Sequence, residues 1–260
     1  MVNAAKHIER NGAQRCSENM VNEIILGDCY ELIKQIPDKS VDLIYTDIPY
    51  LFALGGKPRT DTNASRIAKS VVKTMNELTE ITSGIDWAIL DDFVRVMKRI
   101  NCFIWCSKDQ ILYLLNYFKS KGANFEILTW NKSNPTPMTN NTYLPDIEYC
   151  LYFREGGVKL NDGYFLKSKW YASQKNIADK HHYDHPTIKP LELVKRHISH
   201  TTQEGDLVLD PFIGSGTTAV AAKELGREYI GMEIDTKWHK VAVDRLQNID
   251  ARGQIAFLAR

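Results

Sequence analysis

The sequence predicts an α/β protein with one mostly parallel sheet. Short runs of β-branched residues alternate with segments whose apolar residues recur at helical spacing, as expected for strands joined by crossover helices. Residues 206–234 add a strand, a glycine-rich turn, a helix and a second strand in direct succession. At 260 residues the chain can bury one large core, and nothing in it demands two domains. We therefore expect residues 1–260 to form a single domain.

Strands and helices alternate through the first half of the chain. The predicted elements are a strand at 22–28, a short helix from 29 that ends near Pro37, a strand at 41–47, a helix at 87–100, a strand at 102–107 and a helix at 108–122 that ends at Gly122. A long polar segment from about Ala53 to Thr74 interrupts them, and we interpret it as an insertion.

The second half begins with two runs that predict antiparallel strands, at 125–132 and 146–155. The later elements are a helix after Pro190 (189–202), a strand at 206–210, a helix at 216–226, a strand at 228–234 and a helix at 236–249. This alternation of strands and helices is what places neighbouring strands in one parallel sheet.

The overall charge does not identify a partner, because 33 basic side chains stand against 32 acidic ones. The first twenty residues are polar and lack the apolar stretch of a signal peptide, and no later run approaches the length of a membrane span. We therefore expect a soluble, cytoplasmic protein without a membrane partner.

The five cysteines form no CxxC pair, which is unlike a secreted disulfide framework and predicts reduced, mostly buried thiols. Cys102 and Cys106 share one face of a predicted strand and fit small core residues, because a metal site would need further ligands. The run "HHYDH" (His181, His182, His185) has a better composition for zinc, but His185 also belongs to a motif described below. We predict no metal site.

The most specific segment runs from Asp210 to Glu233. Gly214 and Gly216 lie in the turn after the first strand, and Glu233 ends the second strand 19 residues after Gly214. Glycines let the backbone approach a ligand, helix N–H groups favour anionic atoms, and a carboxylate at this position accepts ribose hydroxyl bonds. A P-loop is excluded because no Lys follows the glycines, and a dinucleotide dehydrogenase is disfavoured because the third glycine of GxGxxG is missing. An ordinary tight turn is the remaining alternative.

The run "DLIYTDIPY" (42–50) ends an apolar strand in a carboxylate, a proline and an aromatic ring. An ordinary turn could account for this ending, because proline restricts φ and aspartate bonds its own backbone readily. A reaction site also fits, because ligands bind at the carboxyl ends of strands in open α/β sheets.

Several motifs in one order resemble the DNA amino-methyltransferases that use S-adenosylmethionine. The run "DPFIGSGTT" with "GMEID" is similar to their cofactor motif, and "TDIPY" is similar to their catalytic motif (D/N/S)PP(Y/F). "HPTIKPLELVKRHI" resembles the HPTxKP element of the family, and "LTWNKSNPTP" with "DIEYCLYF" resembles its late strands. Because the catalytic motif precedes the glycine loop, the order resembles the beta class. The resemblance extends from about Glu23 to Leu246.

The resemblance implies a Rossmann-like methyltransferase sheet, mostly parallel with a reversed antiparallel edge strand. Such a sheet normally begins with the glycine-loop strand, which comes late here, so the order implies a circular permutation. The permuted ends should meet between the helix holding Trp238 and the strand holding Glu23. DNA-contacting insertions are expected at about 53–74 and 154–184.

The resemblance assigns catalysis to Asp47, Ile48, Pro49 and Tyr50. An exocyclic base amine is a poor nucleophile because its lone pair is delocalised into the ring, and two acceptors aimed at its hydrogens favour a pyramidal nitrogen. The side chain of Asp47 and the carbonyl of Ile48 would be these acceptors, Pro49 would fix the turn, and Tyr50 would stack on the flipped base. Ile48 stands where the family usually has proline, so we expect the chemistry to survive with an altered rate or base fit.

The first motif position favours adenine-N6 methylation, because cytosine-N4 members of the family more often carry Ser than Asp there. We expect a site-specific adenine-N6 DNA methyltransferase. Cytosine-N4 methylation is the nearest alternative, followed by methylation of RNA or a small molecule, and by a DNA-binding relative without catalysis. C5-cytosine methylation is excluded because no Pro-Cys pair is present.

The cofactor contacts implied by the resemblance come from three regions. Asp28 matches the acid that accepts from the cofactor's adenine amine, Thr187 and Lys189 fall near its methionine end, and Asp210 could accept from its amino group. Local alternatives remain, because Asp28 could cap a helix, Lys189 could be solvated and Thr187 could bond the turn backbone. The expected set for S-adenosylmethionine is Asp28, Cys29, Asp47, Thr187, Lys189, Asp210, Phe212, Gly214, Ser215, Gly216, Thr217 and Glu233.

Positive charge is concentrated in two segments predicted to be irregular. Residues 53–74 hold five basic and one acidic side chain, and residues 154–180 hold six and three, so DNA phosphates are the natural partner. Aromatic residues in the second segment could stack on bases or pack a small hairpin. The expected DNA contacts are Lys57, Arg59, Arg66, Lys167, Lys169 and Lys175. The resemblance also implies a homodimer, and a cognate restriction endonuclease is a candidate partner.

Overall fold

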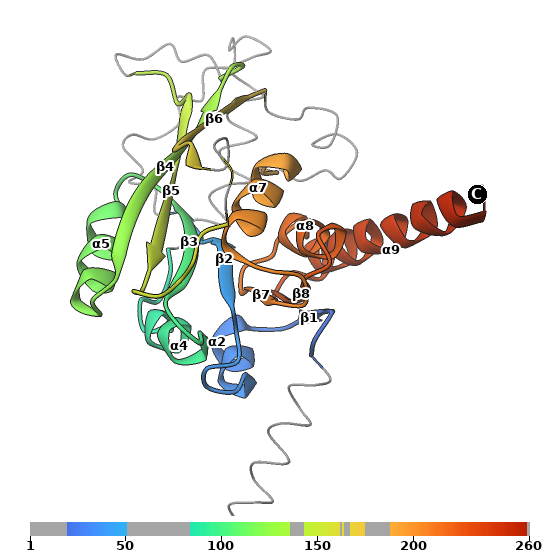
Figure 1. Cartoon of the computed structure of the whole chain (residues 1–260), viewed down its shortest axis with the longest axis horizontal. Coiled ribbons are helices and arrows are strands. Elements are labelled where there is room, and N and C mark those ends of the chain that lie inside the picture. The colour runs from blue at the N-terminus through green and yellow to red at the C-terminus, as the bar shows by residue number, and fades with distance from the viewer. Residues whose placement is uncertain are drawn as a thin grey trace, which may run out of the picture.

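The computed structural model describes residues 20–50, 84–135, 143–161, 163, 167–174 and 188–258, with side chains described as far as residue 248. Its central feature is a single eight-stranded sheet (Figure 1), with the strands in the order β1-β8-β7-β2-β3-β5-β4-β6. The strands are β1 (Glu23–Leu26), β2 (Leu43–Asp47), β3 (Asn101–Cys106), β4 (Asn124–Lys132), β5 (Ile147–Arg154), β6 (Trp170–Ser173), β7 (Leu207–Asp210) and β8 (Glu228–Glu233).

Most of the sheet is parallel. The strands β1, β8, β7, β2 and β3 run in one direction, and β5 is antiparallel to both of its neighbours, β3 and β4. The predicted α/β class is thus confirmed, with one difference in the position of the reversed strand. Four residues of the segment expected to be irregular form β6, which pairs in parallel with β4 and takes the edge position. The reversed strand β5 therefore lies inside the sheet.

The described helices cover the sheet on both faces, as Figure 1 shows. They are α2 (Cys29–Leu32) with the short 3-10 helix η1 (Ile33–Gln35), α4 (Ile89–Val96), α5 (Ile111–Ser120), α7 (Leu191–Thr201), α8 (Thr217–Glu224) and α9 (Thr236–Leu258). One core lies between the sheet and α2, η1, α4 and α5, and a second core lies between the sheet and α7, α8 and α9. The molecule is a three-layer α/β/α sandwich.

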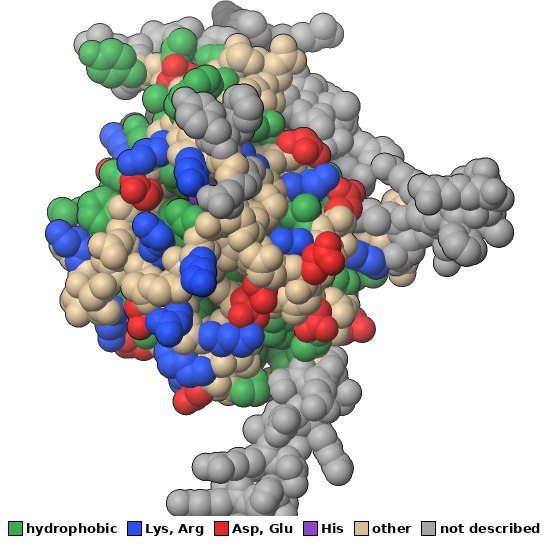
Figure 2. Space-filling view, viewed as in Figure 1, with side chains coloured by type: hydrophobic (Ala, Val, Ile, Leu, Met, Phe, Trp, Pro, Cys, Tyr) green, Lys and Arg blue, Asp and Glu red, His purple; other side chains and the backbone are tan. Residues whose placement is uncertain are grey.

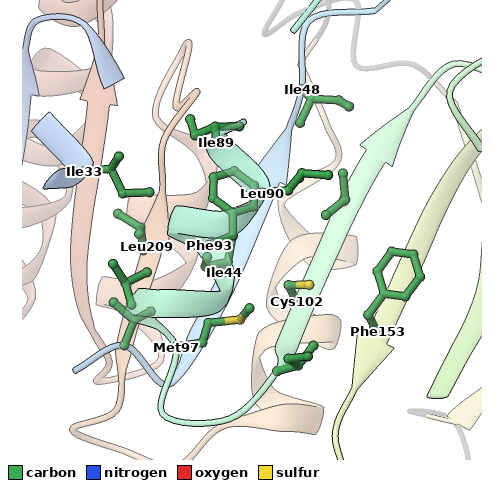
Figure 3. Close-up of a cluster of buried hydrophobic side chains, with 14 of the residues drawn as sticks. Ile33, Ile44, Ile48, Ile89, Leu90, Phe93, Met97, Cys102, Phe153 and Leu209 are labelled. Carbon is green, nitrogen blue, oxygen red and sulfur yellow. The ribbon is translucent and has the colours of Figure 1, made fainter. Parts of the chain in front are cut away.

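The alternation of side chains along the central strands explains why both faces are buried. On β2, Ile44 belongs to the first core, whereas Leu43 and Tyr45 belong to the second. Figure 3 shows Ile44 of the sheet facing Leu90 and Phe93 of α4. A parallel strand buried on both faces must be apolar throughout, which is why β2 reads as an uninterrupted hydrophobic run up to Thr46 and Asp47.

The first and last strands of the sheet lie side by side, as the permuted order predicts. The first strand, β1, pairs in parallel with the last strand, β8. The helix α9 follows β8 and packs beside β1, where Nε2 of His239 lies 2.9 Å from the carbonyl oxygen of Ile24. The glycine-loop strand β7 consequently occupies the middle of the sheet although it comes late in the sequence.

The four cysteines in the described part of the chain are free and buried, as predicted. Within the same residues, no group of three or more His, Cys, Asp or Glu is arranged to hold a metal ion. The histidines of the "HHYDH" run lie outside the described residues. No helix in the part of the chain that the structure describes is both long and apolar enough to traverse a bilayer.

Candidate active site

Acidic side chains gather where the parallel strands end. Asp47 ends β2, Asp210 ends β7, Glu233 ends β8, and Asp28 follows β1 by two residues. The register pairs Ile44 of β2 with Leu209 of β7, so the strand that ends at Asp47 lies directly beside the strand that enters the glycine loop. The two motifs are far apart in the sequence, but the sheet brings them together at one edge.

The backbone after Asp47 is held by two hydrogen bonds. The amide of Ile48 donates to the carbonyl of Trp105 at 3.2 Å, and the buried Ile48 side chain packs into the first core (Figure 3). The side-chain amide of Gln110 donates to the carbonyl of Pro49 at 2.9 Å. The proline usual at position 48 could not make the first of these bonds, so burial and an extra backbone bond stabilise this turn where the family uses ring stiffness.

Asp47 does not stand alone, because Lys189 reaches it from the segment before α7. The ammonium of Lys189 pairs with Oδ2 of Asp47 and lies 2.9 Å from Oε2 of Glu148 on β5. Lys132, at the end of β4, pairs with the other oxygen of Glu148. Four charged side chains with alternating sign therefore form a chain of ion pairs behind the catalytic motif.

Aromatic rings surround this lysine. The Lys189 ammonium lies 5.0 Å from the ring centroid of Trp105 and 5.6 Å from that of Tyr50. It also donates to the Tyr50 hydroxyl at 3.3 Å. Tyr50 thus borders the same site as Asp47, which is where a ring that stacks on a base would have to be.

The electrostatics of these groups follow from burial and from their partners. Burial raises the pKa of Asp47 above its ordinary value, the charge of Lys189 offsets part of that shift, and Glu148 adds to it. Burial also works against ionisation of Glu148, but Lys189 and Lys132 outweigh it and lower the pKa of Glu148 to about 2. The pKa of Lys189 lies above its usual value because both carboxylates outweigh its burial.

The glycine loop has the backbone that a close-lying ligand requires. Gly214 and Gly216 have φ values of 52° and 83°, in the left-handed region that glycine adopts without strain. A Cβ on Gly216 would come within 2.9 Å of the Cβ of Ala242 on α9. The Gly214 amide donates to Oε2 of Glu233 at 2.9 Å, so the loop and the end of β8 are joined directly.

The helix α9 also holds the loop through Arg245. This side chain is 6% exposed, and its guanidinium donates to the carbonyl of Ser215 at 2.6 Å. The same nitrogen reaches the hydroxyls of Ser215 and Thr217 at 3.0 and 3.1 Å. The charge-assisted hydrogen bonds of Arg245 therefore hold the glycine turn against α9.

The acids around the loop have defined environments. Oδ1 of the buried Asp210 accepts from the amide of Phe212 at 3.2 Å, and burial raises the pKa of Asp210 to about 7. Asp28 caps α2 by accepting from the amide of Tyr30 at 2.9 Å. The local role expected as an alternative for Asp28 is therefore present, and its contact with a cofactor stays a prediction. Burial raises the pKa of the neighbouring Cys29 to about 12, so this cysteine is a neutral thiol.

The glycine loop and the neighbouring strand ends fit S-adenosylmethionine. A cradle of glycine backbone, a carboxylate at the end of β8 and an exposed acid after β1 line one edge of the sheet in the order in which the methionine, ribose and adenine parts of such a cofactor would need them. The described members of the expected cofactor set, whose contacts with a cofactor stay a prediction, are Asp28, Cys29, Asp47, Lys189, Asp210, Phe212, Gly214, Ser215, Gly216, Thr217 and Glu233. Thr187 lies outside the described residues.

The expected DNA contacts are only partly described. Lys167 and Lys169 are exposed, and Lys169 pairs with Glu126 of β4, whereas Lys57, Arg59, Arg66 and Lys175 lie outside the described residues. Figure 2 shows basic and acidic side chains mixed over the described surface of one face. Charge on this face does not by itself select a binding surface.

Sequence reasoning missed four residues of the site: Lys132, Glu148, Gln110 and Arg245. Glu148 and Lys132 are charged residues in runs predicted to be strands, which is an unusual position for an acid and a base. Arg245 interrupts the apolar face of a predicted helix between Ala242 and Leu246. A charged residue within an otherwise apolar strand or helix indicates a functional or structural contact, but the sequence does not show which residue it contacts.

Comparison with known proteins shows which family this chain belongs to. The model of the N6/N4 family of DNA methylases matches residues 41–244. The type II methyltransferase M2.DpnII of Streptococcus pneumoniae is 30% identical over 257 residues, which cover 87% of this chain and 90% of the relative. The type II methyltransferase M.HinfI of Haemophilus influenzae is 31% identical over 253 residues, which cover 89% of this chain and 70% of the relative.

Solved structures show the same fold. The crystal structure of the M1.HpyAVI complex with SAM superposes with a TM-score of 0.63 at 25% identity, covering 86% of this chain and 98% of that one. The PvuII DNA methyltransferase, a cytosine-N4-specific protein, superposes with a TM-score of 0.64 at 16% identity, covering 85% and 84% of the two chains. At that identity the second likeness concerns the fold alone.

Proposed function

Because this chain belongs to the N6/N4 family of DNA methylases, we propose that it is a DNA methyltransferase that transfers the methyl group of S-adenosylmethionine to the N6 amine of adenine. The observation that carries the proposal is the position of Asp47. Its carboxylate ends the strand next to the glycine loop, and its Oδ1 is buried without a hydrogen-bond partner among the described residues. An unpaired buried acceptor is costly, and a substrate N–H group would satisfy it.

The residues of the chain act on the amine in defined ways. Asp47 accepts one N–H bond and the carbonyl of Ile48 accepts the other, which turns the nitrogen lone pair away from the base ring. Tyr50 stacks on the flipped base and keeps it in this orientation. The bonds to Trp105 and Gln110 hold the Ile48 and Pro49 backbone still, so the acceptors are in place before the reaction begins.

The bound cofactor supplies an electrophilic methyl group on a positively charged sulfur. With the cofactor bound, the amine nitrogen would bond to the methyl carbon as the carbon–sulfur bond breaks, and the electron pair of that bond would neutralise the sulfur. The nitrogen would then carry the positive charge. It would lose one proton to solvent, along a route beside the carboxylate of Asp47. Alignment and electrostatics account for the rate enhancement, and no covalent intermediate with the enzyme is needed.

Asp47 also supports adenine over cytosine as the substrate, because cytosine-N4 members of the family more often carry Ser at this motif position. The exposed Lys167 and Lys169, with the basic residues of segments 53–74 and 154–184, are proposed to contact DNA phosphates. The type II relatives support a role in modifying a specific DNA site in a bacterial cytoplasm, together with a cognate restriction endonuclease as partner. A homodimer is proposed from the resemblance to the family.

The test is transfer of labelled methyl groups from S-adenosylmethionine to duplex DNA, followed by mass spectrometry of the released nucleosides. We expect N6-methyl-2′-deoxyadenosine as the product, and a loss of about 10²-fold or more in rate for Asp47→Ala. Asp38→Ala removes a surface aspartate that, like Asp47, is paired with a basic side chain, in this case Arg95. This variant is the control and should keep its activity. N4-methylcytosine as the product would refute the assignment of the base, and equal labelling by Asp47→Ala would refute the role of Asp47.

A further inference from the structure

The ion pairs behind Asp47 are unusual because they are largely withdrawn from solvent and are centred on a buried lysine. The exposed fractions of the side chains are 7% for Lys189, 13% for Glu148, 14% for Lys132 and 30% for Asp47. These residues come from four places in the chain: the end of β2, the end of β4, the start of β5 and the segment before α7. Taking a charge such as that of Lys189 out of water is costly before any pairing, so stability alone is a poor reason for such a cluster.

The charges of the cluster are balanced when all four groups are ionised. Two lysines then face two carboxylates in the order Lys132, Glu148, Lys189, Asp47. The two inner members are each shared: Lys189 lies between two acids, and Glu148 lies between two bases. The state of Asp47 is therefore tied to Glu148 through a single ammonium group.

The contacts of Asp47 are asymmetric. Lys189 engages Oδ2, whereas Oδ1 is buried and has no hydrogen-bond partner among the residues that the structure describes. Resting on the proposed function, we propose that Lys189 and Glu148 are positioning residues for Asp47: Lys189 holds Oδ2 so that Oδ1 faces the substrate amine, and Glu148 draws part of the ammonium charge away from Asp47. A carboxylate that shares its cation with a second acid remains a stronger acceptor than one in an exclusive ion pair.

The two positioning residues act on Asp47 in opposite directions. The positive charge of Lys189 lowers the pKa of Asp47, and the negative charge of Glu148 raises it. Removing Glu148 leaves Lys189 to pair with Asp47 alone, which lowers the pKa of Asp47. Removing Lys189 leaves Asp47 buried beside a second acid, which raises the pKa of Asp47. Since ionised Asp47 is the stronger acceptor for the amine, activity falls as pH falls through its pKa.

Other titratable groups face Asp47 and must be separated from this effect. The described groups from neighbouring elements are Lys189, Glu148, Tyr50, Cys106 on β3, Cys150 on β5 and Asp210 on β7. Tyr45 lies on the same strand as Asp47 and is hydrogen-bonded in the second core. All but the two positioning residues are unchanged in the variants below. Asp210, whose pKa burial raises to about 7, is also influenced by Asp47, so the carboxyl titration of Asp47 described below separates the two acids.

The experiment compares the wild-type protein with Glu148→Gln and Lys189→Met. Single-turnover methyl transfer to duplex DNA is measured as a function of pH, with cofactor affinity measured in parallel. For Glu148→Gln we expect the acid limb of the rate profile to move to lower pH by about one unit with a lower plateau, and for Lys189→Met we expect it to move to higher pH by about one unit. The affinity for S-adenosylmethionine of Glu148→Gln should stay that of the wild type.

The ion pair between Lys195 and Glu224, on α7 and α8, provides matched controls. Glu224→Gln and Lys195→Met make the same chemical changes in a pair outside the site, and neither should move the acid limb. Shifts of the same sign in Glu148→Gln and Lys189→Met, or no shift in either, would overturn the proposal. A merely structural role would lower both rates without displacing the limbs in opposite directions.

A carboxyl titration keeps this inference distinct from the proposed function. In protein with ¹³C-labelled aspartate, the Asp47 resonance is identified by its loss in Asp47→Asn and is followed with pH in the wild type and both variants. Opposite displacements of its midpoint support the coupling even if the wild type methylates no DNA, an outcome that would refute the proposed function alone. Identical midpoints in all three proteins would refute the coupling even if the wild type is active.

Discussion

At the scale of single residues, Ile48 shows how a departure from a family motif is accommodated. The motif usually places proline here, and isoleucine restores a backbone donor that bonds to Trp105. Its side chain is 1% exposed and extends the core up to the active site. Burial of the Ile48 side chain and one hydrogen bond thus stabilise the turn in place of a rigid proline ring. The backbone carbonyl that the proposed chemistry uses is kept.

The variant Ile48→Pro tests this account. It removes the donor to Trp105 and part of the buried side chain, so the free energy of unfolding should fall by about 1–3 kcal/mol. The acceptor carbonyl of residue 48 stays, so the single-turnover rate should change far less than in Asp47→Ala. Thermal unfolding and transfer assays measure the two effects. An unchanged unfolding temperature would show that the bond and the packing of Ile48 contribute nothing.

At the scale of elements, the glycine loop depends on the helix that comes last in the chain. Arg245 of α9 donates to three oxygens of Ser215 and Thr217, and Ala242 of the same helix fills the space that any side chain at position 216 would need. Loop and helix therefore form one unit, although a strand and a second helix separate them in sequence. The proposed cofactor site is built by both.

Arg245→Met should therefore weaken the binding of S-adenosylmethionine. We expect the dissociation constant to rise about tenfold, because loop hydrogen bonds of about 1 kcal/mol each are lost. Isothermal titration of the purified protein measures this, and Arg99→Met, which removes a surface arginine bonded to Gly156, is the control. A lower unfolding temperature with unaltered cofactor affinity would contradict a positioning role for Arg245.

At the scale of the whole molecule, the sheet brings both motifs to one edge and leaves the proposed DNA contacts to segments that join its strands. The exposed Lys167 and Lys169 precede the edge strand β6, on the side of the sheet away from β1. Lys169 pairs with Glu126, a surface contact of little net energy that a DNA phosphate would replace without large cost. DNA is accordingly expected to approach from the β6 side.

The triple variant Lys167→Ala, Lys169→Ala and Lys175→Ala tests that arrangement. DNA affinity should fall, and the slope of its logarithm against log salt should decrease in magnitude by about 2 to 3, because each lost phosphate contact contributes about one unit. Replacing Lys34, Lys119 and Lys121 with alanine removes the same charge elsewhere and should leave DNA affinity closer to that of the wild type. An equal salt slope in the Lys167 variant and the wild type would exclude this surface.

The sequence by itself determined the order of elements, the strand that ends at Asp47, the glycine turn and Glu233, because these features depend on side-chain periodicity and motifs within a few dozen neighbouring residues. Only the tertiary structure decided that β6 takes the edge of the sheet, that Lys189 and Glu148 meet Asp47, and that Arg245 holds the glycine loop. Lys189 and Asp47 are 142 residues apart, and their contact depends on the register and packing of strands whose pairing no local pattern specifies. Periodicity places a residue on a face of its own element, whereas partners across elements are chosen by the folded sheet as a whole.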